Sequence, residues 1–234
     1  MVKNVHPPEI KAVLFEANGV LLDMEPLAKQ DQHVARTEFG LELSTEEIRA
    51  LWRHSLAEDF YPALFKGGRG ADQLTWEQMR AIFQGYDDSD PAFMGQPLPD
   101  AAATLDTLRQ SGVKTGLVTV TPADLIEKRM RHAGLWQDKL DLIHAGAETE
   151  ARAGRPLLGR SIGQLATWDI APQEVLYVGP QPSVATEAAA INAQYAAVST
   201  GAYSHMELLA AGIPPERLIH GLGQLPGLLG IQNA

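Results

Sequence analysis

Polar residues that could act on an anion follow three apolar runs of the chain. These residues are Glu16–Gly19, Thr119–Thr121 and Gly179–Ser183. Fixed backbone N–H groups in a turn can hold an anion without a metal ion. Asn18, Gly19 and Thr119 therefore predict a site for a small anion, to which the positive charge of Arg155 would contribute.

These polar groups need a sheet to bring them together. Short apolar runs that end in turn residues are typical of buried strands, and they alternate with helical patterns from Gly95 onward. Such alternation indicates right-handed crossovers and a parallel sheet covered by helices on both faces. The sequence therefore predicts an α/β fold with a Rossmann-like sheet, whose ligands bind outside the carboxyl ends of the strands. The expected strands are 11–15, 113–118, 140–145, 174–178, 194–198 and 217–219, and the expected helices are 101–110, 121–134, 157–168, 184–191 and 205–211.

Residues 23–94 show no strand-like alternation and predict an inserted block of helices. Capping boxes, Ser44 with Glu47 and Thr75 with Gln78, mark two helix starts, each followed by apolar side chains on one face. The aromatic residues expected in the core of this block are Trp52, Trp76, Phe60 and Tyr61. The predicted domains are a core formed by 1–22 and 95–234 and an all-helical cap formed by 23–94.

The composition excludes several classes of function. The chain has 19 basic and 29 acidic side chains, a formal net charge of −10, so no basic surplus is available to bind nucleic acid. It has no cysteine, which rules out disulfides, thiolate metal sites and cysteine nucleophiles. No apolar run approaches the roughly 20 residues of a membrane span. We therefore expect a cytoplasmic protein that binds neither nucleic acid nor a membrane.

The strand ends resemble the motifs of the haloacid dehalogenase superfamily, which consists mostly of magnesium-dependent phosphatases and phosphomutases. Residues 15–27 resemble its first motif, an Asp-x-Asp-Gly pattern followed by a helical cap, and Thr119 matches the Thr or Ser of its second. Gly154–Pro156 stand where the family has Gly-Lys-Pro, and 177–183 where it has Val-Gly-Asp-Ser. The order holds along nearly the whole chain. The resemblance implies the family's fold and the cap of the subgroup with phosphoglycolate phosphatase, β-phosphoglucomutase and haloacid dehalogenases.

The chain departs from this family at the reacting positions. In the family the first Asp attacks phosphorus or carbon, the second protonates the leaving group, the Lys holds phosphate, and a fourth-motif carboxylate completes a magnesium site. At these positions the chain has Glu16, Asn18, Arg155 and Pro180. A displacement of about 1 Å can cost 10²-fold in rate, and loss of a general acid roughly 10²–10⁴-fold. Proline offers no side-chain oxygen, whereas magnesium requires several.

Three functional hypotheses follow. The first is a catalytically impaired pseudo-hydrolase without a metal or other cofactor, which binds a small anionic metabolite or a protein partner and in which Glu16 pairs with Arg155. The second is a divergent hydrolase, phosphatase or haloacid dehalogenase-like, that uses Glu16 or relocated residues and, in this case only, Mg²⁺. The third is a structural homodimer that associates through the cap or the C-terminal segment. The resemblance makes Glu16, Asn18 and Arg155 the candidate catalytic positions under the first two hypotheses.

Overall fold

One parallel sheet forms the centre of the molecule. The computed structural model describes residues 9–54, 57–146 and 158–231, and among them six strands pair in the order β3-β2-β1-β4-β5-β6. The strands are β1 (Ala12–Phe15), β2 (Lys114–Val118), β3 (Leu142–His144), β4 (Val175–Gly179), β5 (Gln194–Val198) and β6 (Leu218–Ile219). Phe15, the last residue of β1, lies opposite Leu117 of β2 and Val178 of β4. The carboxyl ends of these three strands therefore meet at one edge.

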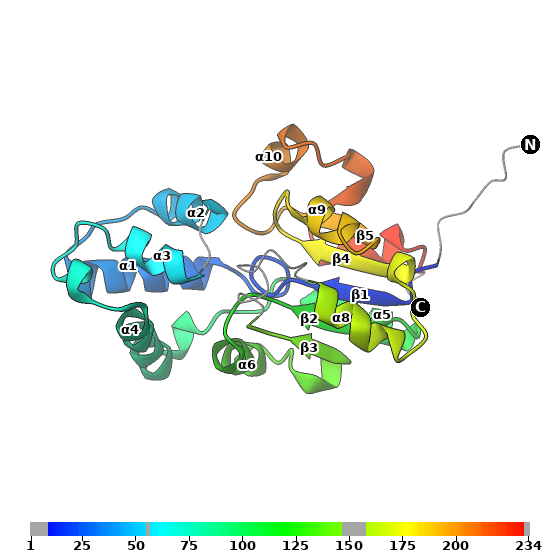
Figure 1. The fold of residues 1–234 in the computed structure, drawn as a ribbon, viewed down its shortest axis with the longest axis horizontal. Helices are drawn as coiled ribbons and strands as arrows, with labels where there is room; N and C mark the ends of the chain where they lie inside the picture. Colours follow the sequence, from blue (N-terminus) through cyan, green and yellow to red (C-terminus); the bar gives the residue numbers. More distant parts are fainter. Residues whose placement is uncertain (1–8, 55–56, 147–157, 232–234) are drawn as a thin grey trace, which may run out of the picture.

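Helices cover both faces of this sheet (Figure 1). The helices of the core are α5 (Ala101–Gln110), α6 (Ala123–His132), α8 (Gly159–Ala166), α9 (Val184–Ala189), α10 (His205–Ala210) and α11 (Leu225–Leu228). On one face Phe15 packs in a buried cluster with Leu105 of α5 and Ile126 of α6. On the other face Leu14 packs in a second cluster with Leu165 of α8. Alternate residues of a strand point to opposite faces, so the apolar run of β1 contributes to both, and the predicted α/β fold is confirmed.

A helical cap is inserted between β1 and β2 and lies to one side of the sheet (Figure 1). Its helices are α1 (Glu25–Phe39), α2 (Thr45–His54), α3 (Ala57–Leu64) and α4 (Trp76–Ser89). They enclose a separate apolar cluster that contains Phe60 and against which Trp52 and Tyr61 pack, as predicted. Trp76 does not belong to this cluster of described residues, and its ring lies 5.5 Å from the guanidinium carbon of Arg80. The prediction was wrong for Trp76 because its place at the first turn of α4 leaves it half-buried.

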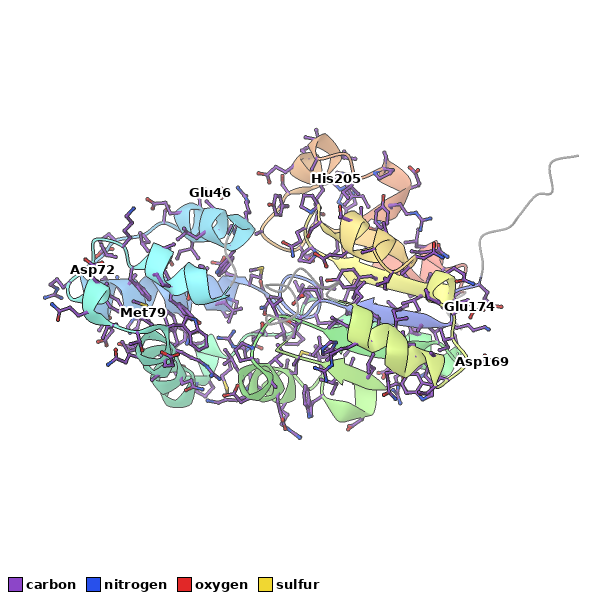
Figure 2. The ribbon with its side chains drawn as sticks, viewed as in Figure 1. Glu46, Asp72, Met79, Asp169, Glu174 and His205 are labelled. Carbon is purple, nitrogen blue, oxygen red and sulfur yellow. The ribbon has the colours of Figure 1, made fainter. Side chains whose placement is uncertain are left out.

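Both predicted capping boxes form. The amides of Glu47 and Gln78 donate to the hydroxyls of Ser44 and Thr75 at 3.2 and 3.3 Å, and the side chains of Glu47 and Gln78 accept from the amides of Ser44 and Thr75, both at 2.8 Å. Short 3-10 helices lie at Ala71–Gln73, Pro91–Phe93, Gln137–Lys139, Pro172–Glu174, Pro215–Arg217 and Leu222–Gln224. Asp72, in the first of these, lies at the end of the cap farthest from the core (Figure 2).

The chain enters and leaves the cap side by side. The amide of Asp23 donates to the carbonyl of Gln96 at 2.8 Å, and the amide of Leu98 donates to the carbonyl of Leu21 at 2.9 Å. This pairing lies beside the boundaries that we predict at residues 22 and 95, and those boundaries stay a prediction.

Polar side chains also join the cap to the core. Arg53 of α2 donates from Nε and Nη2 to the carbonyl of Ala202, at 2.9 and 2.8 Å, in the segment before α10. Arg80 of α4 donates to Asp124 of α6 at 2.6 Å. Figure 1 shows α2 and the segment before α10 approaching each other. We call these contacts the cap–core seam.

Two elements end at other residues than the sequence predicts. The strand expected at 140–145 is shorter, Leu142–His144, and α8 spans Gly159–Ala166 within the expected 157–168. No helix among the residues that the structure describes is long and apolar enough to cross a bilayer. The cytoplasmic location stays a prediction.

Candidate functional site

The carboxyl group of Glu16 lies at the centre of the site. Strand β1 delivers Glu16 to the carboxyl edge of the sheet, where the residue is only 7% exposed. The hydroxyl of Thr119, the first residue after β2, donates to its Oε1 at 2.6 Å. The amide of Ala17 donates to the same oxygen at 2.9 Å. The side chain thus turns back over its own backbone and takes two donors that point into the site.

Burial raises the pKa of Glu16 from its ordinary value of 4.5 to about 7. The donors from Thr119 and from the amides of Ala17 and Asn18 lower the pKa, but by less than desolvation raises it, and the charge of Glu187 raises it further. Among the residues that the structure describes, none of these influences is a cation. The Glu16 carboxyl group therefore titrates closer to neutral pH than an ordinary glutamate does.

Asn18 belongs to a short polar network with the second strand end. Its Nδ2 donates to the hydroxyl of Thr121 at 3.2 Å, and the amide of Thr121 donates to the hydroxyl of Thr119 at 3.3 Å. The Oδ1 of Asn18 is buried and has no hydrogen-bond partner among the described residues. The structure therefore brings the side chains of Glu16, Asn18, Thr119 and Thr121 together.

The turn at Gly19 packs against two later segments. Gly19 has a φ of 74°, and a Cβ at this position would lie 2.6 Å from the Cα of Gly201. A Cβ on Gly201 would in turn lie 2.5 Å from the Cβ of Pro180. The hydroxyl of Thr200 donates to the carbonyl of Gly19 at 2.7 Å. Three backbone segments thus meet here in close contact.

The amide of Gly19 has a partner within this turn. It donates to the carbonyl of Leu22 at 2.8 Å, so it does not offer a free N–H to a ligand in this structure. Arg155 lies outside the described residues, and its predicted pairing with Glu16 stays a prediction. Anion binding by Asn18, Gly19, Thr119 and Arg155 also stays a prediction.

The residues at the site do not fit magnesium, the metal that the family resemblance implies. Magnesium takes hard oxygen ligands in near-octahedral order, usually with a carboxylate or two among them. Pro180, at the position of the metal carboxylate, has no side-chain oxygen, and its ring lies against Gly201. No group of three or more His, Asp or Glu residues that could hold a metal ion occurs in the described part of the chain. We derive no step through a metal here.

Sequence reasoning missed Glu187, which lies beside the site. Glu187 lies one turn after Ser183 on α9, and its amide donates to the Ser183 carbonyl at 2.8 Å. Its charge acts on Glu16 and on Tyr177 of β4, which is 1% exposed. Burial, with both carboxylates, raises the pKa of Tyr177 well above its ordinary value. The helical spacing from Ser183 was the available signal for Glu187, because that turn directly follows a strand end.

Comparisons with known proteins agree with this architecture. The chain matches the model of the haloacid dehalogenase-like hydrolase family over residues 10–191. It is 25% identical to the phosphoglycolate phosphatase of Yersinia pestis over 221 residues, which are 94% of this chain and 93% of that protein. It is 26% identical to the phosphonoacetaldehyde hydrolase of Bordetella pertussis over 177 residues, which are 70% of this chain and 64% of that protein.

Solved structures show the same fold. CbbY of Rhodobacter sphaeroides, solved in complex with phosphate, superposes with a TM-score of 0.72 at 16% identity and covers 94% of this chain and 99% of its own. A haloacid dehalogenase-like family protein of Streptococcus pneumoniae superposes with a TM-score of 0.70 at 16% identity, covering 93% of this chain and 97% of its own. With the family model matching most of its length, this chain belongs to the haloacid dehalogenase-like hydrolase family.

Proposed function

We propose that this chain is a haloacid dehalogenase-family protein that has lost magnesium-dependent turnover and retains the scaffold. The observation that carries the proposal is the state of Glu16, which stands at the position of the family's attacking carboxylate. Its carboxyl group is buried and accepts hydrogen bonds from Thr119 and Ala17 of its own chain. A nucleophile needs an ionised oxygen that points at the substrate, whereas this carboxyl group is engaged by its own chain and its burial raises its pKa to about 7.

The neighbouring positions support the same conclusion. Asn18 has no proton to exchange near neutral pH, which removes a general-acid contribution of roughly 10²–10⁴-fold. Its Nδ2 is engaged with Thr121. Pro180 supplies no metal ligand and packs on Gly201. The three substitutions thus affect attack, proton transfer and metal binding together.

The test is a panel of phosphate monoesters and 2-haloacids, assayed with and without magnesium. We expect the wild-type protein to show no turnover above that of Glu16→Ala. A variant with the family residues restored, Glu16→Asp with Asn18→Asp and Pro180→Asp, should gain at least about 100-fold in magnesium-dependent turnover. Robust magnesium-dependent turnover by the wild type that disappears in Glu16→Ala would refute the proposal.

A second candidate is a divergent hydrolase, most simply a phosphatase, in which Glu16 attacks the substrate. The comparisons favour this candidate over the first, because the matching family model and the named curated relatives are those of hydrolases. It predicts turnover that is lost in Glu16→Ala and that rises with pH as Glu16 ionises around pH 7. A pH–rate profile from pH 5 to 9 therefore separates the two candidates.

Binding to a protein partner or to a second copy of the chain belongs to this proposal as well. The acidic net charge of −10 agrees with the expectation that nucleic acid is not a partner. Size-exclusion chromatography with light scattering tests the homodimer, and a strictly monomeric mass would count against it.

A further inference from the structure

We infer that Glu16 is the internal ligand of a site for a small oxyanion and keeps that site closed to external anions. The site is the cradle formed by the hydroxyl of Thr119 and the amide of Ala17, at the carboxyl ends of β1 and β2. The inference deepens the proposed function and rests on it in one respect, that the Glu16 carboxyl group occupies the cradle rather than attacking a substrate.

The hydrogen bonds within the cradle carry the inference. A carboxylate oxygen and a phosphate oxygen accept the same donors, hydroxyl and backbone N–H groups, with similar geometry. Both donors reach a single oxygen, Oε1, at 2.6 and 2.9 Å. The bond from Ala17 closes between adjacent residues, so the carboxyl group is folded back onto its own turn. It therefore stands where an oxygen of an external anion would accept both bonds.

The alternative is that Glu16 is an ordinary structural carboxylate. A structural buried carboxylate is normally stabilised by a cation, because the loss of hydration is expensive. The main influences on Glu16 are neutral donors and the negative charge of Glu187. Among the residues that the structure describes, the site thus provides polar N–H and O–H groups and no countercharge for Glu16. Such a set of neutral donors suits an oxyanion.

Removal of the Glu16 side chain beyond Cβ would take the acceptor from the amide of Ala17 and would leave the hydroxyl of Thr119 only the longer contact to Oγ1 of Thr121, at 3.3 Å. Thr119 is 0% exposed, and an unpaired buried donor costs about 1–3 kcal/mol. An external oxyanion small enough to enter would satisfy both donors. Occupancy by Glu16 and binding of an external oxyanion are therefore mutually exclusive.

The experiment measures binding of inorganic phosphate by isothermal titration calorimetry at pH 7.5. We expect Glu16→Ala to bind phosphate at least about tenfold more tightly than the wild type, which corresponds to one good hydrogen bond to a charged group. Glu16→Gln keeps the length of the side chain and should bind no better than the wild type. In the Glu16→Ala background, Thr119→Val should reverse the gain.

A charge-matched control separates occupancy from repulsion. Glu187→Gln removes a nearby negative charge and leaves Glu16 in place, so it should not open the site. Phosphate binding by Glu16→Gln or Glu187→Gln as tight as that by Glu16→Ala would overturn the inference, because charge alone would then close the site. Equal binding by the wild type and Glu16→Ala would overturn it as well. Circular dichroism checks folding, and Glu16→Ser, which vacates the same space, serves if the alanine variant unfolds.

These outcomes are measured independently of turnover. Wild-type hydrolysis that requires Glu16 would refute the proposed function and, with it, the premise that Glu16 occupies the cradle rather than attacking a substrate; equal phosphate binding by the wild type and Glu16→Ala would overturn the inference alone. The two failures are therefore distinguishable.

Discussion

The strand-end site and the cap–core seam both join segments that are far apart in the sequence, but they treat charge in opposite ways. At the site, Glu16 is 7% exposed and is held by neutral donors. At the seam, the side chains of Arg53 and Arg80 are 17% and 25% exposed. Arg53 contacts a carbonyl group and carboxylates, and Arg80 contacts a carboxylate. In the part of the chain that the structure describes, the site buries a carboxyl group without a counterion, whereas the seam pairs its charges close to water.

This difference separates the two regions energetically. Burial without a countercharge shifts a pKa by whole units, and each unit is worth about 1.4 kcal/mol. Exposed ion pairs contribute about 0–1 kcal/mol because solvent screens them. The site should therefore respond strongly to pH, and the ion pairs of the seam should contribute little to stability.

The largest expected effect is the dependence of stability on pH at Glu16. Its pKa in the folded state, about 7, lies above the ordinary value of 4.5, so the unfolded chain releases the proton first as pH rises. The stabilising contribution is complete below pH 4.5 and is lost as pH rises through 7. The free energy of unfolding of the wild type, minus that of Glu16→Gln, should fall by about 3 kcal/mol between pH 4.5 and 8. Chemical denaturation at several pH values measures it.

The glutamine variant is the matched control for this experiment, since it keeps the length of the side chain and cannot ionise. A difference between the two proteins that stays flat across this range would mean that Glu16 is as well solvated as an ordinary carboxylate. The site would then not differ from the seam in how strongly it desolvates its charged group.

The next effect in size concerns Arg53, which holds the cap against the core. Besides its two bonds to Ala202, its guanidinium lies 5.3 Å from the centre of the Tyr203 ring and 3.4 Å from Glu207. Hydrogen bonds to a charged group are worth about 1.5–3 kcal/mol, so Arg53→Ala should cost about 2 kcal/mol in the free energy of unfolding. Arg53→Lys keeps the charge but loses the two-pronged contact, and it should recover less than half. Hydrogen exchange should become faster at residues 199–204.

A loss confined to global stability, with unchanged exchange at 199–204, would contradict the assignment of Arg53 to the seam. A lysine variant as stable as the wild type would show that charge alone suffices. Either result would make the seam more like an ordinary surface.

Local patterns made much of this molecule predictable. The alternation of apolar runs and helical periods indicated the sheet, and Ser44 with Glu47 marked the start of α2 because a capping box is complete within four residues. The position of Glu16 at a strand end was predictable because it directly follows the apolar run of residues 11–15. The family motifs then indicated which strand ends to compare.

The remaining features depend on tertiary contacts. The approach of Gly201 to Gly19 and Pro180 depends on the path of the chain after β5, for which spacing gives no signal. The orientation of the Glu16 carboxyl group, back toward Ala17, is a choice of side-chain torsions that the residue type does not specify. The charge of Glu187 reaches the site only because α9 packs beside β4. The first and third of these features are contacts between residues far apart in the sequence, and the second is a choice of torsions within one residue.

The smallest expected effect is at Arg80 and Asp124, the second contact of the seam. The carboxylate of Asp124 is 60% exposed, although both of its oxygens accept from Nη2 of Arg80. Solvent screening should therefore reduce their coupling to less than about 1 kcal/mol. A double-mutant cycle with Arg80→Ala and Asp124→Ala measures that coupling, and 0.5 M salt should weaken it further. A salt-independent coupling of about 2 kcal/mol would show that this pair is desolvated, as Glu16 is, because only desolvated charges resist screening to that degree.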